Sequence, residues 1–108
     1  MRAVEKITVV NQGAYVFNFS VQWLSSDGKW NTSDWNSGNY PVGQSRTTPS
    51  LASIGVPADA LAVTPYGHAV AGTSGQGAPF VAPAANGQIA TYQATGTTFI
   101  NFAITLIE

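Results

Sequence analysis

The sequence contains no cysteine and a single histidine, His68. The missing cysteines exclude disulfide bonds, thiolate metal ligands and thiol nucleophiles together. One imidazole is too few for a metal site with two histidine ligands or for a metalloprotease helix. The sequence therefore predicts no metal site and no cofactor, and it leaves few groups for acid–base chemistry.

Charge is also scarce. Four Lys or Arg and five Asp or Glu residues give a formal net charge of −1, and charged residues make up 8% of the chain, against about 25% in ordinary domains. The basic residues Arg2, Lys6, Lys29 and Arg46 are scattered along the chain. This spacing predicts neither a nucleic-acid partner nor a polybasic membrane anchor. The surface must consist mainly of neutral hydrogen-bonding groups.

Long apolar runs are missing as well. No stretch approaches the roughly 20 residues needed to cross a bilayer, and MRAVEKITVV lacks the apolar segment and cleavage site of a secretory signal. We therefore expect one domain over residues 1–108 without a transmembrane segment. It would be either cytoplasmic or released without a cleaved leader.

The groups needed for catalysis do not form a recognisable motif. A Ser/His/Asp triad would have to use His68, but no Gly-x-Ser-x-Gly elbow accompanies it. Glycoside hydrolysis needs two carboxylates across a cleft, and Asp34 has no partner because the other acidic residues lie in predicted turns or near the chain ends. The glycine-rich stretch 72–77 lacks the Lys-Ser/Thr of a phosphate loop. We predict a protein that is not an enzyme and has no catalytic residues.

Alternation of apolar and polar residues is strongest in residues 14–24, AYVFNFSVQWL, which predicts a strand with one buried face. A β-branched run at 6–10 precedes it and ends at Asn11-Gln12-Gly13, which has hairpin-loop chemistry. These two strands are expected to form an antiparallel pair. An Asp-Gly turn follows, and a third strand is expected to begin at 29–31.

The rest of the chain predicts further short strands separated by turns. Pro49 marks the strand at 44–51 as a sheet edge, and one helical turn is expected within 51–60. Pro65 and Gly67 are expected to interrupt 61–70, and Asn86-Gly87 to close a hairpin. The other expected strands are 79–83, 88–94 and 97–107, with Ile100, Phe102, Ile104 and Leu106 sharing one face of the last.

No stretch shows helical periodicity over three turns. Seven or eight short strands at regular turn intervals predict an all-β fold, an antiparallel β-sandwich of immunoglobulin-like or lectin-like character. A small barrel is the alternative.

The segment 29–43, KWNTSDWNSGNYPVG, combines aromatic rings with Asn, Asp, Ser and Gly, and this composition predicts a loop. Neutral sugars bind to such groups, because their C–H faces pack on aromatic rings and their hydroxyls pair with amides and carboxylates. Trp35 and Tyr40 are either exposed platforms or core plugs, and Trp30 is either a platform or part of the core. The candidate ligand-binding residues are Trp30, Asp34, Trp35, Asn36, Asn39 and Tyr40, with Tyr66 and His68 as a second cluster.

The runs ITVVNQGAYVFNFSVQW and GQSRTT resemble small β-sandwich proteins of the actinoporin and fungal fruit-body lectin type over roughly the first half of the chain. The resemblance implies a lectin-like surface. Cytolysins of that group carry an N-terminal amphipathic helix, whereas this chain is strand-like from Ile7 onward. No binding residue is transferred from the resemblance.

These observations predict a non-catalytic, lectin-like module that binds a neutral glycan or glycoconjugate. Weak single-site affinity for sugars would require several copies, so a homo-oligomer is expected, with the 44–51 edge as one contact unless Pro49 and Arg46 block it. A membrane-active or toxin-like sandwich, with Trp30, Trp35 and Tyr40 at the lipid headgroups, is the first alternative. The second is a structural or assembly subunit.

Overall fold

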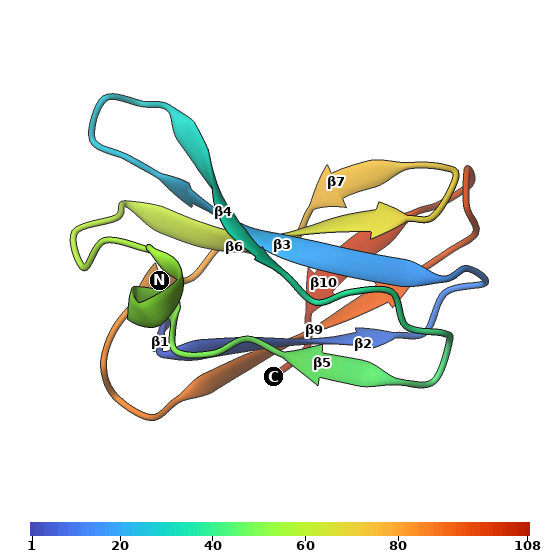
Figure 1. The fold of residues 1–108 in the computed structure, drawn as a ribbon, viewed down its shortest axis with the longest axis horizontal. Coiled ribbons are helices and arrows are strands. Elements are labelled where there is room, and N and C mark those ends of the chain that lie inside the picture. The colour runs from blue at the N-terminus through green and yellow to red at the C-terminus, as the bar shows by residue number, and fades with distance from the viewer.

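The computed structural model describes residues 1–108 and is all-β, with ten strands and one short 3₁₀ helix. Figure 1 shows two layers of strands packed face to face along the long axis of the molecule. The predicted antiparallel β-sandwich is confirmed, with more strands than expected because two of them have only two residues. The elements are β1 (Ala3–Val4), β2 (Lys6–Asn11), β3 (Phe17–Leu24), β4 (Trp30–Asn36), β5 (Ser45–Thr47), η1 (Leu51–Ile54), β6 (Ala62–Ala69), β7 (Ser74–Gln76), β8 (Ala82–Pro83), β9 (Ile89–Thr95) and β10 (Ala103–Leu106).

One layer has the strand order β10-β9-β2-β5, and we call it the β2 sheet. The other has the order β4-β3-β6-β7, and we call it the β3 sheet. Most pairs are antiparallel, but β2 pairs with β9 in parallel, and β1 and β8 form a separate parallel pair. None of the helical segments has the length and apolar character needed to span a bilayer.

The expected hairpin between β2 and β3 is wrong, because the two strands belong to different sheets. The buried Asn11 side chain redirects the chain at this point. Its amide donates to the Tyr15 carbonyl at 2.8 Å and its Oδ1 accepts from the Gly13 amide at 3.0 Å. These bonds hold residues 11–15 in a corner that crosses from one layer to the other.

The expected interruption at Pro65 and Gly67 is also wrong, since β6 runs without a break between β3 and β7. Pro65 accepts a bond from the Gly77 amide at 2.9 Å but has no N–H to return one. The Thr64 hydroxyl donates to the Gly77 carbonyl instead, at 2.9 Å. Gly67 lies where Phe17 and Ile104 approach the backbone, so a Cβ there would collide with both side chains.

The Asn86-Gly87 hairpin is wrong too, because β8 pairs with β1 and not with β9. Asn86 donates to the Ala3 carbonyl at 3.0 Å, and the Gly87 amide donates to the Glu5 carboxylate at 2.8 Å. These hydrogen bonds connect the turn to the N-terminal segment of the chain. The Asn-Gly dipeptide alone gives no information about partners so far away in the sequence.

Segment 29–43 is partly a strand and not the predicted loop. Its residues 30–36 form β4, the edge of the β3 sheet, with a bulge where β4 passes Ser20 and Gln22. Polar residues are tolerated here because an edge strand has one open side. The expected edge strand after Gln44 and the helical turn at 51–60 are confirmed by β5 and η1.

The core lies between the layers. Phe17 and Phe19 of β3 and Tyr92 of β9 are fully buried there, beside the valines of β2, β3 and β6. Ile104 of β10 belongs to the same cluster, and Phe102 and Leu106 pack against it. Ile100, expected on the same face, is 65% exposed because β10 begins only at Ala103.

Candidate functional site

Tyr40 is a core plug and not an exposed platform. Its side chain is 1% exposed, its ring meets Phe17 edge-on at 5.7 Å between centroids, and its hydroxyl donates to the Val9 carbonyl at 2.8 Å. Burial raises its pKa well above the usual range. Tyr40 is therefore withdrawn from the candidate ligand-binding residues.

The two tryptophans of β4 lie on opposite faces of that strand. Trp35 points inward and packs edge-on against Phe19, with 5.3 Å between ring centroids. Trp30 points outward, is 37% exposed and packs against Phe80 at 5.1 Å between ring centroids. Trp30 is therefore the more exposed of these two rings. It lies at the start of β4, away from the other candidates.

The remaining candidates share the outer face of the β3 sheet. The register places Asn36 opposite Ser20 and Ser20 opposite Tyr66, in one row across three strands. His68 lies in the next row, between Asn18 and Ser74. Asn39 joins this face through a 3.0 Å hydrogen bond between its Oδ1 and the Asn18 amide. Asp34 is exposed on the β4 edge, at the bulge.

No group of three or more His, Cys, Asp or Glu residues is placed to hold a metal ion. His68 Nδ1 is hydrogen-bonded to the Ser74 hydroxyl at 2.7 Å. No acidic side chain bonds to this pair, so it lacks the third member that orients a catalytic imidazole.

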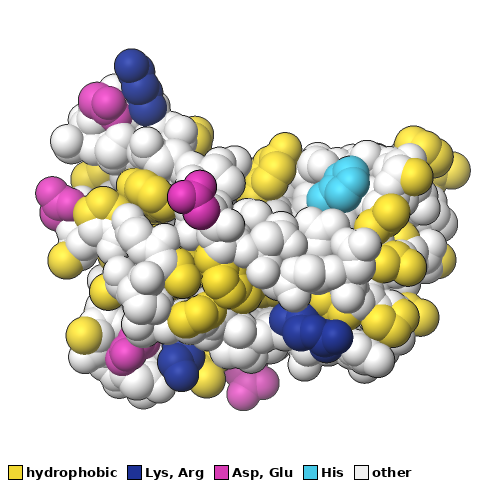
Figure 2. All heavy atoms as spheres, viewed as in Figure 1, with side chains coloured by type: hydrophobic (Ala, Val, Ile, Leu, Met, Phe, Trp, Pro, Cys, Tyr) yellow, Lys and Arg dark blue, Asp and Glu magenta, His cyan; other side chains and the backbone are white.

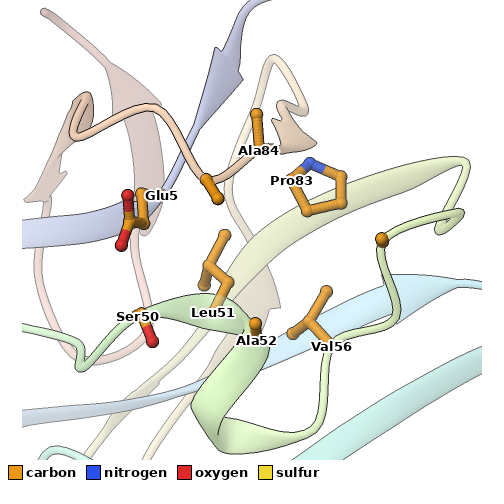
Figure 3. Close-up of a pocket in the computed structure, with 9 residues that line it drawn as sticks. Glu5, Ser50, Leu51, Ala52, Val56, Pro83 and Ala84 are labelled. Carbon is orange, nitrogen blue, oxygen red and sulfur yellow. The ribbon is translucent and has the colours of Figure 1, made fainter.

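The one cavity of note is a small apolar pocket of about 140 Å³. Figure 3 shows Leu51 and Val56 facing Pro83 and Ala84 across it, with Glu5 at its side. The Glu5 carboxylate already accepts the Gly87 amide. The other polar residue of its lining is Ser50, and the rest of the wall is aliphatic.

Four loops gather at the opposite end of the sandwich from this pocket, the right-hand end of Figure 1. They are residues 12–16, 41–44, 70–73 and 96–102, and together we call them the loop end. The Val70 amide donates to the Val16 carbonyl at 2.9 Å, and the Ala14 amide to the Gly96 carbonyl at 2.9 Å. The Gly43 amide donates to the Asn11 carbonyl at 2.7 Å. The loops are therefore fixed to one another by backbone bonds.

Apolar side chains project from the loop end. Half of the ten large hydrophobic residues that are exposed in this structure belong to it, and Phe99 is 75% exposed. Figure 2 shows such side chains along the right-hand end, with the charged ones set back from it. No Lys, Arg, His, Asp or Glu occurs in the four loops. We call this surface the apolar tip, formed by Val16, Val42, Val70, Phe99 and Ile100.

The loop that carries Phe99 is closed on itself. The Thr97 amide donates to the Ile100 carbonyl at 2.8 Å, and the Ile100 amide donates to the Thr97 hydroxyl at 3.0 Å. Gly96 and Asn101 bound the turn with φ angles of 90° and 58°. This turn replaces the first half of the expected last strand, and it holds Phe99 and Ile100 away from the core.

Sequence patterns missed the apolar tip because Phe99 and Ile100 fit the alternation of a strand. Gly96 and Asn101 were the available signal, since glycine and asparagine adopt positive φ angles more readily than other residues. A pair of such residues five positions apart is compatible with a closed turn between them.

No family model and no curated protein matches the chain. Solved structures do match. A Gram-negative toxin aligns with 94% of this chain at 18% identity and a TM-score of 0.52, and pneumolysin aligns with 95% of it at 13% identity and a TM-score of 0.50. The chain spans 22 to 23% of the length of those two proteins. At these identities the likeness establishes a shared β-sandwich fold. The actinoporin and fungal-lectin resemblance has no support beyond that general fold.

Proposed function

We propose that this chain is a non-catalytic module that docks end-on to uncharged membrane surfaces through the apolar tip. The observation that carries the proposal is the gathering of exposed apolar side chains on four loops that contain no Lys, Arg, His, Asp or Glu. The sequence analysis named a membrane-active sandwich as its first alternative. The residues that would face the lipid in this proposal differ from those named there. Trp35 and Tyr40, which that alternative placed at the headgroups, pack inward.

The rigidity of the loops supports the proposal. An apolar side chain on a mobile loop can turn toward the core, whereas Phe99 and Ile100 are held outward by the bonds that close their turn. Keeping such groups in water is unfavourable, and burying a Phe or Ile side chain contributes about 1.5–3 kcal/mol. Contiguous apolar surface of this kind marks a partner or a membrane.

The absence of charged side chains from the loop end indicates which kind of lipid the module would bind. Basic clusters attract anionic lipids, and the loop end has none. Binding through the apolar tip would depend on insertion into the headgroup and upper acyl region, and zwitterionic lipids satisfy that requirement.

Shallow insertion of five side chains is weak for one copy, so a homo-oligomer on the membrane would raise the avidity. The fold shared with much larger toxins is compatible with a module that acts alongside other copies or other domains. If the chain is instead an assembly subunit, it will form oligomers of the same size with and without lipid.

Co-sedimentation with phosphatidylcholine vesicles tests the proposal. Phe99→Ala is expected to weaken binding about tenfold to a hundredfold, because it removes the most exposed apolar side chain of the apolar tip. Leu61→Ala is the matched control, since Leu61 is 54% exposed but lies at the other end of the β3 sheet. Absence of vesicle binding by the parent protein, or equal loss in both variants, contradicts the proposal.

A further inference from the structure

The outer face of the β3 sheet carries a network of uncharged polar side chains. Asn36 donates to Asn18 Oδ1 at 3.2 Å and to Ser20 Oγ at 3.0 Å, and Asn18 donates to Asn39 Oδ1 at 3.0 Å. Gln22 donates to Thr32 Oγ1 at 3.1 Å. The network crosses from the β4 edge onto β3, and it fixes the rotamers of its amide groups.

A second set of bonds continues across the sheet. Gln76 of β7 donates to Gln22 Oε1 at 2.8 Å, and this bond passes over β6. His68 Nδ1 lies 2.7 Å from Ser74 Oγ. All four strands of the β3 sheet are thereby linked on their outer face, with no ion pair among them.

Tyr66 stands in the middle of this network. Its cross-strand neighbours are Ser20 on β3 and Gln76 on β7. The ring is partly exposed, and its hydroxyl makes no hydrogen bond within the protein. Ser20, its neighbour on β3, is a short residue, and Tyr66 itself is only partly buried.

The network leaves donors and acceptors unused. Asn39 Nδ2, His68 Nε2 and the Tyr66 hydroxyl have no partner in the protein, whereas Asn39 Oδ1 accepts from Asn18. Figure 2 shows the histidine surrounded mainly by uncharged polar surface, with the acidic and basic side chains lying away from it. A partly exposed ring beside fixed amide, imidazole and hydroxyl groups suits a ligand with both C–H faces and many hydroxyls.

We propose that this face, centred on Tyr66, binds an uncharged pyranose sugar. The C–H face of the sugar packs on the Tyr66 ring, and its hydroxyls pair with Asn18, Asn39 and His68. Fixed side chains lose little rotamer freedom on binding, which lowers the entropic cost of recognition. In this proposal the predicted glycan site consists of Tyr66, His68, Asn18 and Asn39, and does not include Trp35 or Tyr40.

This site does not share side chains with the apolar tip, but it begins where the tip ends. Asn18 follows the buried Phe17 at the start of β3, and Ser74 follows the tip loop 70–73. A sugar on a membrane-anchored lipid and a sugar on a free oligosaccharide both fit this description. The proposal stands whether or not the apolar tip binds membranes.

The test is an NMR titration of the ¹⁵N-labelled protein with soluble neutral sugars, using methyl mannoside, lactose and cellobiose as probes. We expect the side-chain amide signals of Asn18, Asn36 and Asn39 to shift at millimolar sugar. Tyr66→Ala is expected to weaken the response at least about tenfold, and Tyr66→Phe to retain most of it because the ring remains.

Trp30→Ala is the matched control, since it removes another partly open ring from the same sheet face. Retained amide dispersion in each variant shows that the sheet is folded. The proposal is overturned if Tyr66→Ala responds like the parent, or if Trp30→Ala causes the same loss as Tyr66→Ala.

A second experiment distinguishes a free sugar ligand from a sugar carried on a lipid. Binding to phosphatidylcholine vesicles is compared with and without added glucosylceramide. A lipid-borne ligand predicts that the glycolipid strengthens binding of the parent and of Phe99→Ala but not of Tyr66→Ala. A free oligosaccharide ligand predicts shifts with the soluble probes and no gain from the glycolipid, and no response in either experiment overturns the site.

Discussion

At the scale of single residues, Asn11 fixes the corner on which the loop end is built. Its side chain is fully buried and bonds to Tyr15, Tyr40 and Gly13. An amide removed from this position leaves a buried carbonyl and a buried N–H without partners, and each costs about 1–3 kcal/mol. The loops that carry the apolar tip therefore depend on one polar side chain of the interior.

Asn11→Ala is accordingly expected to lower the free energy of unfolding by about 2–4 kcal/mol. Urea unfolding followed by tryptophan fluorescence measures the change. Gln12→Ala, at the exposed neighbouring position, is the control and should change stability by less than about 0.5 kcal/mol. Equal effects of the two substitutions would show that the buried amide is not the cause.

Because of the buried tyrosines, the free energy of unfolding depends on pH in the alkaline range. Burial raises the pKa of Tyr15 and of Tyr92 to about 12, from 10.0. Between these values the unfolded chain releases protons that the native state keeps, so the native state loses stability as the pH rises. The contribution is complete below pH 10.0 and is lost as the pH passes about 12.

We therefore expect the free energy of unfolding to be level near neutral pH and to fall steeply above about pH 10. Urea unfolding at a series of pH values measures it. Tyr15→Phe removes one titrating group, together with its 2.8 Å hydrogen bond to the Thr95 carbonyl. The variant should be about 1 kcal/mol less stable at neutral pH and should show a shallower alkaline fall. If the free energy of unfolding falls equally steeply with pH in the variant, Tyr15 does not contribute to the alkaline loss of stability.

At the scale of elements, β6 shows how a strand accommodates a proline. The missing N–H of Pro65 leaves the Gly77 carbonyl without its ladder partner, and the Thr64 hydroxyl supplies that bond. Thr64→Val keeps the shape and removes the hydroxyl, so we expect a loss of about 1–3 kcal/mol in thermal or urea unfolding. Thr47→Val is the control, because its hydroxyl pairs with Thr8 at the surface. Comparable losses in both variants would contradict this account of β6.

The loop between β9 and β10 offers a test that leaves every apolar side chain in place. Gly96 has φ 90°, and a Cβ there would collide with the Asn101 carbonyl. Gly96→Ala should therefore open the turn that holds Phe99 outward, and we expect weaker vesicle binding with the apolar composition unchanged. Gly28→Ala, also at a positive φ but in open space far from the loop end, is the control for strain alone. Unchanged binding by Gly96→Ala would show that the turn need not be fixed.

At the scale of the whole molecule, the distribution of charge sets the expected salt response. The loop end contains no Lys, Arg, His, Asp or Glu, so near neutral pH it has no charged side chain whose interactions salt could screen. Binding to phosphatidylcholine vesicles is expected to change less than about twofold between low and high salt. Vesicles with added phosphatidylserine should bind no more tightly. A steep loss of binding with salt would instead indicate an electrostatic contact elsewhere on the molecule.

The sequence was sufficient for local features. Alternation in β3, the turn chemistry at Asp27-Gly28 and the proline at 49 correctly indicate a β-sandwich with an edge strand near β5. It failed where a distant partner decides the outcome. Pro65 is tolerated through Thr64 and Gly77. Asn86-Gly87 does not close a hairpin, because it is hydrogen-bonded to Ala3 of β1 and to Glu5. Such contacts join residues far apart in the chain, and a short window cannot contain both.

The amino-acid sequence by itself determined a neutral, cysteine-free β protein whose surface is rich in amides and hydroxyls, because composition fixes what a surface can offer. Only the tertiary structure decided which of those groups share one exposed face. It buried Tyr40 in the core, packed Trp35 against the core, and aligned Asn18, Tyr66 and His68 on one face. It also brought four loops together as an apolar tip. Side-chain direction depends on which strand lies beside which, and that pairing is settled only when the two sheets pack.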